Sequence, residues 1–267
     1  GLVSSWQDLQ TKGYVVIQQA LSPELVETLV ADFGRGARPH EYPHGFKLVS
    51  RRALNKIRPL IESLLEEVRA QTDLEVDTIN FLTYSHYVTT ELADKVSCLH
   101  QDFDLDYQLT GEHVNYLNFW TPIIKPERER SNLRVVPLDA LPLEVRGRLV
   151  GGGGHRFRVE AGRTVVEGRG ERFELDVDIE ERGVDLPTSA GDLVVLRGDV
   201  PHRTQDVDTR RVAASVRATA SNKIIKKSRS EMEDPRLRKM LQECFQTLGR
   251  DTVTVAEFVD FSQGKSP

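Results

Sequence analysis

Apolar positions recur along this chain at two different spacings. The first quarter of the chain shows the three-to-four-residue repeat of amphipathic helices. Such helices are predicted over 21–33 and 50–72, after a short β-branched strand at 13–17. Ser22 is suited to the N-cap of the first helix. Pro59 is expected to kink or restart the second helix, because proline cannot donate a backbone hydrogen bond.

The middle of the chain contains short runs of β-branched and aromatic residues, separated by residues that favour turns. Eight strands are predicted, at 76–88, 113–123, 133–138, 156–160, 164–167, 172–179, 192–197 and 210–219. Many short strands at this spacing indicate a sandwich or a jelly roll. The helical spacing then returns, most clearly at 234–249, which begins with Asp-Pro and ends at Gly249.

These patterns predict one domain over residues 1–267. A helical N-terminal support (1–75) precedes a jelly-roll core (76–220), and C-terminal helices (221–267) follow it. Within the core, a run of four glycines precedes a predicted hairpin insertion around 151–185. A chain of 267 residues is long enough to bury a substantial core.

Composition argues against several classes of function. The formal net charge of -5 argues against a nucleic-acid-binding protein, which usually has a basic surface. No apolar run approaches the length of a membrane-spanning helix, so no membrane partner is expected. The two cysteines, Cys98 and Cys244, do not make a disulfide framework. We therefore expect a cytoplasmic protein that acts on a small molecule.

The candidate chemistry begins in the segment SCLHQDFDLD. His100 and Asp102 lie two residues apart after a strand-like run, and in a strand both side chains would point to one face. A later apolar strand and a Gly-Asp turn lead to His202. Two histidines and one carboxylate form the facial triad of non-haem Fe(II) oxygenases. Asp104 and Asp106 are interpreted as acidic residues of a surface loop.

An arginine that could bind a cosubstrate lies on the next predicted strand, RRVAASVRAT. The guanidinium group binds a carboxylate through two parallel hydrogen bonds and stays charged when buried, which suits the far carboxylate of 2-oxoglutarate. Strand alternation places Arg211, Ala213, Ser215 and Arg217 on one small, polar face, and Arg210 on the opposite, apolar face. We therefore expect Arg211 to bind 2-oxoglutarate and keep Arg210 as the alternative.

Taken together, the chain resembles the Fe(II)/2-oxoglutarate-dependent dioxygenases of the phytanoyl-CoA dioxygenase-like group. Four segments carry the resemblance: WQDLQTKGYVVIQQALSPELVETL (6–29), LHQDFD (99–104), SNLRVVPLDALP (131–142) and GDLVVLRGDVPHRTQDVDTRRVAASVRA (191–218). The resemblance implies a double-stranded β-helix with flanking helices, and Fe(II) held by His100, Asp102 and His202. The chain departs from the group at Leu133, where a glycine is common.

The resemblance also implies the reaction. With Fe(II) and O2, 2-oxoglutarate would be decarboxylated to succinate, and an unactivated C–H bond of an amino acid or natural-product intermediate would be hydroxylated. Desaturation, epimerisation or ring formation are alternative outcomes of the same iron chemistry. Further residues are expected around the metal: Thr204, Ser215, Thr83 and Asn118 for the cosubstrate, and Trp120, Arg134 and His86 for the substrate.

Two hypotheses from other classes remain open. A cupin-like metal-binding protein would share the triad without oxygenase chemistry. The arginine after His202 argues against it, because only an enzyme that uses 2-oxoglutarate needs this positive charge. A pure interaction module would use none of these residues, and stoichiometric Fe(II) binding would exclude it. The sequence leaves the substrate and the oligomeric state open.

Overall fold

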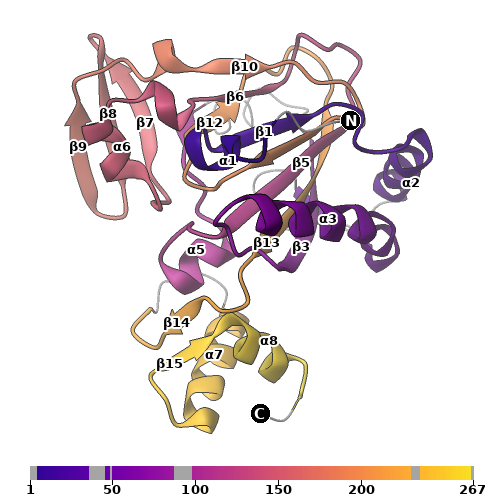
Figure 1. Cartoon of the computed structure of the whole chain (residues 1–267), viewed down its shortest axis with the longest axis vertical. Helices are drawn as coiled ribbons and strands as arrows, with labels where there is room; N and C mark the ends of the chain where they lie inside the picture. The colour runs from indigo at the N-terminus through magenta and orange to yellow at the C-terminus, as the bar shows by residue number, and fades with distance from the viewer. Residues whose placement is uncertain (1–4, 36–45, 49, 87–97, 230–234, 266–267) are drawn as a thin grey trace.

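The computed structural model describes residues 5–35, 46–48, 50–86, 98–229 and 235–265. Two antiparallel sheets form a double-stranded β-helix (Figure 1). The first sheet contains, in this order, β1 (Tyr14–Ile17), β11 (Leu193–Leu196), β5 (Tyr116–Ile124), β13 (Val212–Thr219), β3 (Thr78–His86) and β2 (Phe46–Leu48). The second contains β10 (Val184–Leu186), β6 (Leu133–Val135), β12 (His202–Thr204), β4 (Leu99–His100), β7 (Arg156–Glu160), β8 (Arg163–Gly168) and β9 (Glu171–Leu175).

The central strand β13 divides its side chains between two environments. Val212, Ala214 and Val216 belong to the apolar cluster that contains the buried residues of α2 (Pro23–Gly34) and α3 (Arg51–Gln71). The intervening Ala213 instead belongs to a cluster with residues of β6 in the second sheet. The helices therefore cover one face of the first sheet, as Figure 1 shows for α3, and the other face points to the interior between the sheets.

The N-terminal helices follow the sequence pattern, with one exception. The Ser22 hydroxyl caps α2 by accepting a hydrogen bond from Leu25 N at 3.2 Å. The expected restart at Pro59 is wrong, because α3 runs as one helix from Arg51 to Gln71. Proline has no N–H, so the Asn55 carbonyl loses its helical hydrogen bond. Both residues are exposed, and water can hydrogen-bond that carbonyl.

The second sheet is extended beyond the barrel by a meander. The predicted insertion contains three strands, since β7, β8 and β9 follow one another in antiparallel pairs and β7 joins the sheet beside β4. The helix α6 (Leu143–Leu149) packs on this region through its own apolar cluster. Short helical segments complete the fold: α1 (Asp8–Thr11), η1 (Leu138–Ala140) and η2 (Glu180–Arg182).

The C-terminal part forms a separate apolar cluster next to the barrel (orange to yellow in Figure 1). It contains the hairpin of β14 (Ile224–Lys226) and β15 (Thr252–Thr254), together with α7 (Pro235–Leu248) and α8 (Val255–Ser262). Gly249 follows α7 at a φ of 62°, as expected of a helix-ending glycine. Over the described residues, none of the helices combines the length and the apolar character needed to cross a membrane.

Asp104 and Asp106 are not exposed loop residues, and that interpretation is wrong. The chain turns into the helix α5 (Leu105–Thr110) directly after the candidate metal segment, and Asp104 is its N-cap, accepting from Tyr107 N at 3.1 Å. Asp106 is 3% exposed and lies 2.6 Å from Lys223 Nζ. This buried ion pair joins α5 to the C-terminal part of the chain.

We expect Lys223→Met to lower the free energy of unfolding by about 3–5 kcal/mol, because Asp106 would stay buried without its counter-charge. Urea denaturation at neutral pH measures this loss. The control is Lys265→Met, which removes an exposed pair with Asp260 at 3.7 Å and should change stability by less than about 1 kcal/mol. Equal effects of the two substitutions would contradict the structural role given to the buried pair.

Candidate active site

The two histidines of the predicted triad face each other across neighbouring strands. His100 ends β4 and His202 begins β12, and the two residues are directly paired in the sheet. Their ring centroids lie 4.5 Å apart. Each Nδ1 lies 2.8 Å from a backbone carbonyl, that of Cys98 for His100 and that of Val200 for His202. A carbonyl can only accept, so Nδ1 carries the proton and Nε2 of the neutral ring is left to bind a metal.

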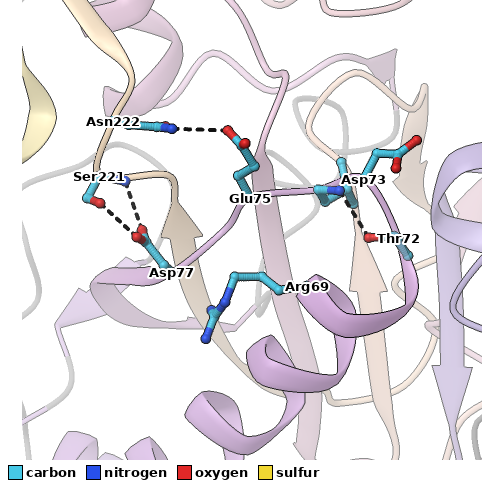
Figure 2. Close-up of a pocket in the computed structure, with 8 residues that line it drawn as sticks. Arg69, Thr72, Asp73, Glu75, Asp77, Ser221 and Asn222 are labelled. Carbon is cyan, nitrogen blue, oxygen red and sulfur yellow. Dashed lines mark hydrogen bonds between the residues drawn. The ribbon is translucent and has the colours of Figure 1, made fainter.

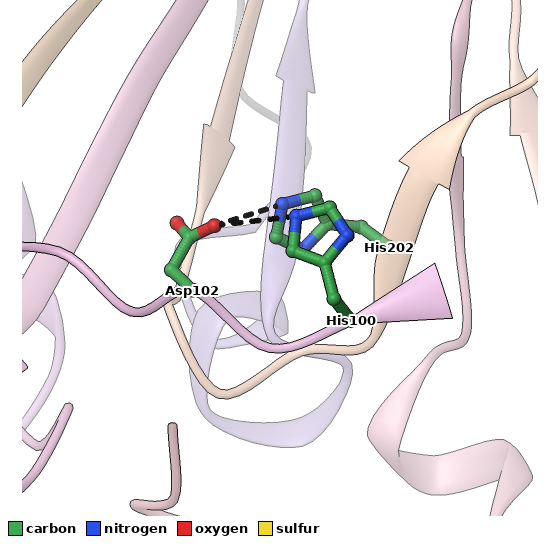
Figure 3. A group of neighbouring side chains, drawn as sticks. All are labelled: His100, Asp102 and His202. Carbon is green, nitrogen blue, oxygen red and sulfur yellow. Dashed lines mark ion pairs between the residues drawn. The ribbon is translucent and has the colours of Figure 1, made fainter. Parts of the chain in front are cut away.

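Asp102 completes the group, although it does not lie in a strand as expected. The strand β4 ends at His100, and Asp102 follows it outside any helix or strand. Its backbone is fixed on both sides, since its N–H donates to Gly198 O at 3.0 Å and its carbonyl accepts from Gly154 N at 3.0 Å. Figure 3 shows the carboxylate pointing at the two imidazole rings.

The spacing of the three side chains suits one metal ion. Asp102 Oδ1 lies 3.1 Å from His202 Nε2 and 3.8 Å from His100 Nε2. One ligand atom from each residue can be chosen so that all three lie within 4.8 Å of one another. The second carboxylate oxygen, Asp102 Oδ2, is buried without a hydrogen-bond partner. The His100 side chain is 33% exposed, so the group is accessible from one side.

The charges of the three groups depend on one another. Burial would lower the pKa of His202, but the Asp102 carboxylate more than offsets this and raises it. Burial would raise the pKa of Asp102, yet His202, His100 and the Arg217 guanidinium together hold it well below its usual value. Burial, reinforced by His202, lowers the pKa of His100 to about 4. The group therefore stabilises a positive charge at its centre.

These pKa shifts predict how metal binding depends on pH. A metal ion must displace the proton of His202, whereas Asp102 is already ionised and His100 is neutral until about pH 4. We expect the affinity for Co(II) to fall about tenfold per pH unit below the raised pKa of His202, with one proton released per ion. Titration calorimetry in two buffers of different ionisation enthalpy measures the released protons. Release of two protons at pH 6 would contradict this assignment.

Arg211 lies in the interior, on the side that strand alternation predicts. It is 2% exposed, and one guanidinium nitrogen donates to Ser131 O at 2.8 Å. Another lies 3.5 Å from Thr204 Oγ1. The guanidinium carbon lies 5.2 Å from the centre of the Trp120 ring. Arg210 is exposed, so the predicted orientation of these two arginines is confirmed.

Most of the other expected residues share this interior. Ser215 is paired with Trp120, and Arg217 with Asn118, between β13 and β5. Ser215, Asn118 and Trp120 are buried, and Asn118 Oδ1 has no hydrogen-bond partner. The Trp120 ring, which was expected at the substrate, lies beside the Arg211 guanidinium group.

Thr83 and His86 are the exceptions in this interior set. Both belong to β3, where Thr83 is paired with Ser215 of β13. Their side chains lie outside the described part of the chain.

Arg134 does not join the site, contrary to expectation. Its neighbours on β6, Leu133 and Val135, point to the interior, so strand alternation turns Arg134 outward. There it donates to Glu180 Oε2 and to Asp185 Oδ1, each at 3.2 Å. These carboxylates already bind the guanidinium group, so we no longer assign it to an acidic substrate.

The structure also places residues near the triad that the sequence pattern did not single out. His113 is buried, and its Nε2 lies 3.1 Å from Asp104 Oδ1. Burial would lower the pKa of His113, but Asp104 raises it. Gln101, which lies between His100 and Asp102 in the chain, is buried. An isolated histidine and a glutamine carry no spacing signal, so only the fold could reveal these contacts.

A surface hollow at the C-terminal end of α3 offers no comparable chemistry (Figure 2). It has a volume of about 660 Å³, and none of the triad residues lines it. Its carboxylates are bound within the chain, since Asp77 accepts from Ser221 Oγ at 2.7 Å and Glu75 accepts from Asn222 Nδ2 at 3.0 Å. We therefore assign the candidate active site to the interior of the barrel.

Comparison with known proteins finds no matching family model and no matching curated protein. Solved structures do match. The non-heme alpha ketoglutarate dependent epimerase SnoN from nogalamycin biosynthesis aligns at 13% identity and a TM-score of 0.55, over 86% of this chain and 88% of that chain. The carbocyclase SnoK of the same biosynthesis aligns at 17% identity and a TM-score of 0.53, over 88% and 89%. A Pseudomonas putida prolyl-4-hydroxylase aligns at 13% identity and 0.51, over 81% and 97%.

The chain has the fold of these enzymes. The jelly-roll core expected from the strand pattern is therefore confirmed. At such low identities the likeness concerns the fold alone. The chemistry of the site has to be argued from the residues of this chain.

Proposed function

We propose that this protein is a non-haem Fe(II)/2-oxoglutarate-dependent oxygenase. One observation carries the proposal: His100, Asp102 and His202 converge inside a double-stranded β-helix, with the ligand atoms within 4.8 Å of one another. The buried Arg211, just before β13 of the facing sheet, supports it, because a guanidinium group stays charged when buried and its planar fork suits the far carboxylate of 2-oxoglutarate. SnoN, whose fold this chain shares, has been solved with Fe3+ and alpha ketoglutarate.

The donor set fits Fe(II). Two neutral imidazoles and one carboxylate, which together leave coordination positions open, are the ligands of Fe(II) oxygenases. The partnerless Asp102 Oδ2 and the two Nδ1–carbonyl hydrogen bonds fit ligands that are held in place for a cation. When bound, Fe(II) with 2-oxoglutarate and O2 would supply the oxidation of an unactivated C–H bond, with 2-oxoglutarate converted to succinate and CO2.

The chain's own residues would orient the cosubstrate. Arg211 would bind the far carboxylate, assisted by Thr204, whose hydroxyl already lies beside the guanidinium group. Ser215 and Asn118 line the same interior, and the free Asn118 Oδ1 is available for a polar contact. The Trp120 ring would close one wall of this pocket and exclude water from the charged pair. Thr83 is proposed as a further contact from β3.

Hydroxylation of a small molecule is the outcome that we propose. Related halogenases lack a carboxylate at the position of Asp102, and its presence here favours transfer of oxygen. We also propose that the chain belongs to the phytanoyl-CoA dioxygenase-like group within this class, because the four segments quoted above resemble that group. The likeness to an epimerase and a carbocyclase makes epimerisation and ring formation the alternatives.

A screen of amino acids and natural-product intermediates tests the proposal. Purified protein is incubated with Fe(II), 2-oxoglutarate and O2, and succinate and substrate-derived products are measured by mass spectrometry. Succinate should form together with a product that has gained one oxygen atom. A product that has lost two hydrogens, or kept the substrate's mass, would support the alternatives. No succinate with any substrate, from protein that binds Fe(II), would favour a cupin-like metal protein instead.

A further inference from the structure

Gln101 lies between the two candidate ligands of the first segment, and its side chain points away from them. It is 1% exposed, although it is a polar residue. Its side-chain Nε2 donates to Leu149 O at 2.7 Å and to Asp199 O at 2.7 Å. Both hydrogens of the amide are therefore used, and each goes to a backbone carbonyl of a different segment.

The remaining oxygen of this amide has its own partner. Gln101 Oε1 lies 2.8 Å from Nδ1 of the buried His155. The oxygen can only accept, so His155 Nδ1 is the donor. The other ring nitrogen, Nε2, lies 3.2 Å from Glu171 Oε2 on β9. Every polar atom of the Gln101 side chain is thus bonded, and the hydrogen-bond pattern fixes the orientation of its amide.

These bonds join the segments that carry the three ligands. Asp199 belongs to the turn that leads into His202, and Asp102 N donates to Gly198 O in the same turn. The turn is itself rigid, because the Asp199 carboxylate accepts from Arg197 at 2.6 Å and from Gly151 N at 2.8 Å. Gln101 N also donates to His155 O at 2.9 Å.

The sheet alone holds this region weakly. The strand β4 has two residues, and its pairing with β12 is limited to His100 and His202. Few ladder hydrogen bonds can therefore set the distance between Asp102 and His202. The Gln101 amide supplies one bond across the same junction, to Asp199 O, and a second bond to Leu149 O at the end of α6.

We propose that Gln101 is a positioning residue, which sets the separation of Asp102 from His202 by linking their segments through Asp199, Leu149 and His155. The inference rests on the proposed metal centre. It goes beyond that proposal by giving a specific task to a residue that cannot touch the metal.

Binding of Co(II) alone tests this inference without any turnover. Gln101→Met keeps the approximate length of the side chain and removes all three of its side-chain hydrogen bonds. Gln101→Glu keeps its shape but places carboxylate oxygens against the Leu149 and Asp199 carbonyls. We expect both to weaken Co(II) binding by about 10- to 100-fold and to change the visible absorption of the bound ion, as loss of outer-shell support typically does.

A matched control separates positioning from general stability. Thr164 is buried in the meander, where its hydroxyl donates to Val177 O at 2.7 Å and accepts from Ile179 N at 3.0 Å. Thr164→Val should lower the thermal unfolding midpoint without changing the Co(II) affinity or spectrum. His155→Phe, which removes one of the three amide bonds, should weaken Co(II) binding by a smaller factor, and it decides the question if the Gln101 variants do not fold.

Each result has one interpretation. The positioning role would be overturned if the Gln101 variants lost stability as the control does but kept the wild-type Co(II) affinity and spectrum. If they do not fold, the same result with His155→Phe would overturn it. Wild-type protein that binds no Co(II) would instead refute the proposed metal centre, and the role of Gln101 with it.

Discussion

Replacing His202 by alanine should abolish the turnover of 2-oxoglutarate and weaken Fe(II) binding by more than about 100-fold. The substitution removes one of the three proposed ligands. This loss should exceed that of an outer-shell partner, which typically weakens metal binding about 10- to 100-fold. It also removes the group that lies 3.1 Å from Asp102 Oδ1. Asp102→Ala should give the same loss of binding, because the carboxylate supplies the only negative charge among the three proposed ligands.

The measurement is equilibrium binding of Fe(II) under anaerobic conditions, with folding checked by circular dichroism. The control is Asp176→Ala, which removes a carboxylate that is 92% exposed and far from the triad in the chain. It should leave both binding and turnover unchanged. A folded His202→Ala protein that binds Fe(II) like the wild type would show that the assigned triad is wrong.

Arg211→Ala should raise the Michaelis constant for 2-oxoglutarate by at least about 30-fold, while the affinity for Fe(II) stays nearly unchanged. Removing one partner of a buried charge pair costs about 2–5 kcal/mol of binding free energy. Each 1.4 kcal/mol corresponds to a factor of about ten in the dissociation constant. The carboxylate of the cosubstrate would be left without a counter-charge among buried residues such as Trp120. Arg211→Lys keeps the charge but not the planar fork, and we expect an intermediate effect.

Arg210→Ala is the matched control, since it removes the neighbouring guanidinium group from the exposed side of the same strand end. It should change the Michaelis constant by less than about twofold, because an exposed charge interacts weakly with a buried ligand. Steady-state kinetics with varied 2-oxoglutarate distinguishes the two variants. If Arg210→Ala carried the effect, the role assigned to Arg211 would be contradicted.

The strand pattern predicted much of the barrel, because alternation is a local property of the sequence. Each of the eight predicted strands overlaps a strand of the structure, and the alternation over 210–219 correctly predicted a buried Arg211 and an exposed Arg210. The strands that carry the histidines were not predictable as strands. β4 has two residues and β12 has three, too few for any periodicity to appear.

Contacts between distant segments escaped the sequence for a different reason. Arg134 meets Glu180, which lies 46 residues further along the chain, and Asp106 meets Lys223, 117 residues away. Nothing in the local pattern distinguishes these charged residues from solvated ones. The triad itself could be predicted because its residue types and order resemble those of a known group. The contacts of the Gln101 side chain could be identified only from the fold.

The most direct test of the central claim is the anaerobic addition of 2-oxoglutarate to Fe(II)-loaded protein, followed by visible absorption. Chelation of Fe(II) by the 2-oxo acid end of 2-oxoglutarate produces a charge-transfer band, and no substrate is needed to see it. Our account predicts a band that saturates at one equivalent of 2-oxoglutarate in the wild type and is absent in His202→Ala. Wild-type protein that binds Fe(II) but shows no new band with 2-oxoglutarate would contradict it.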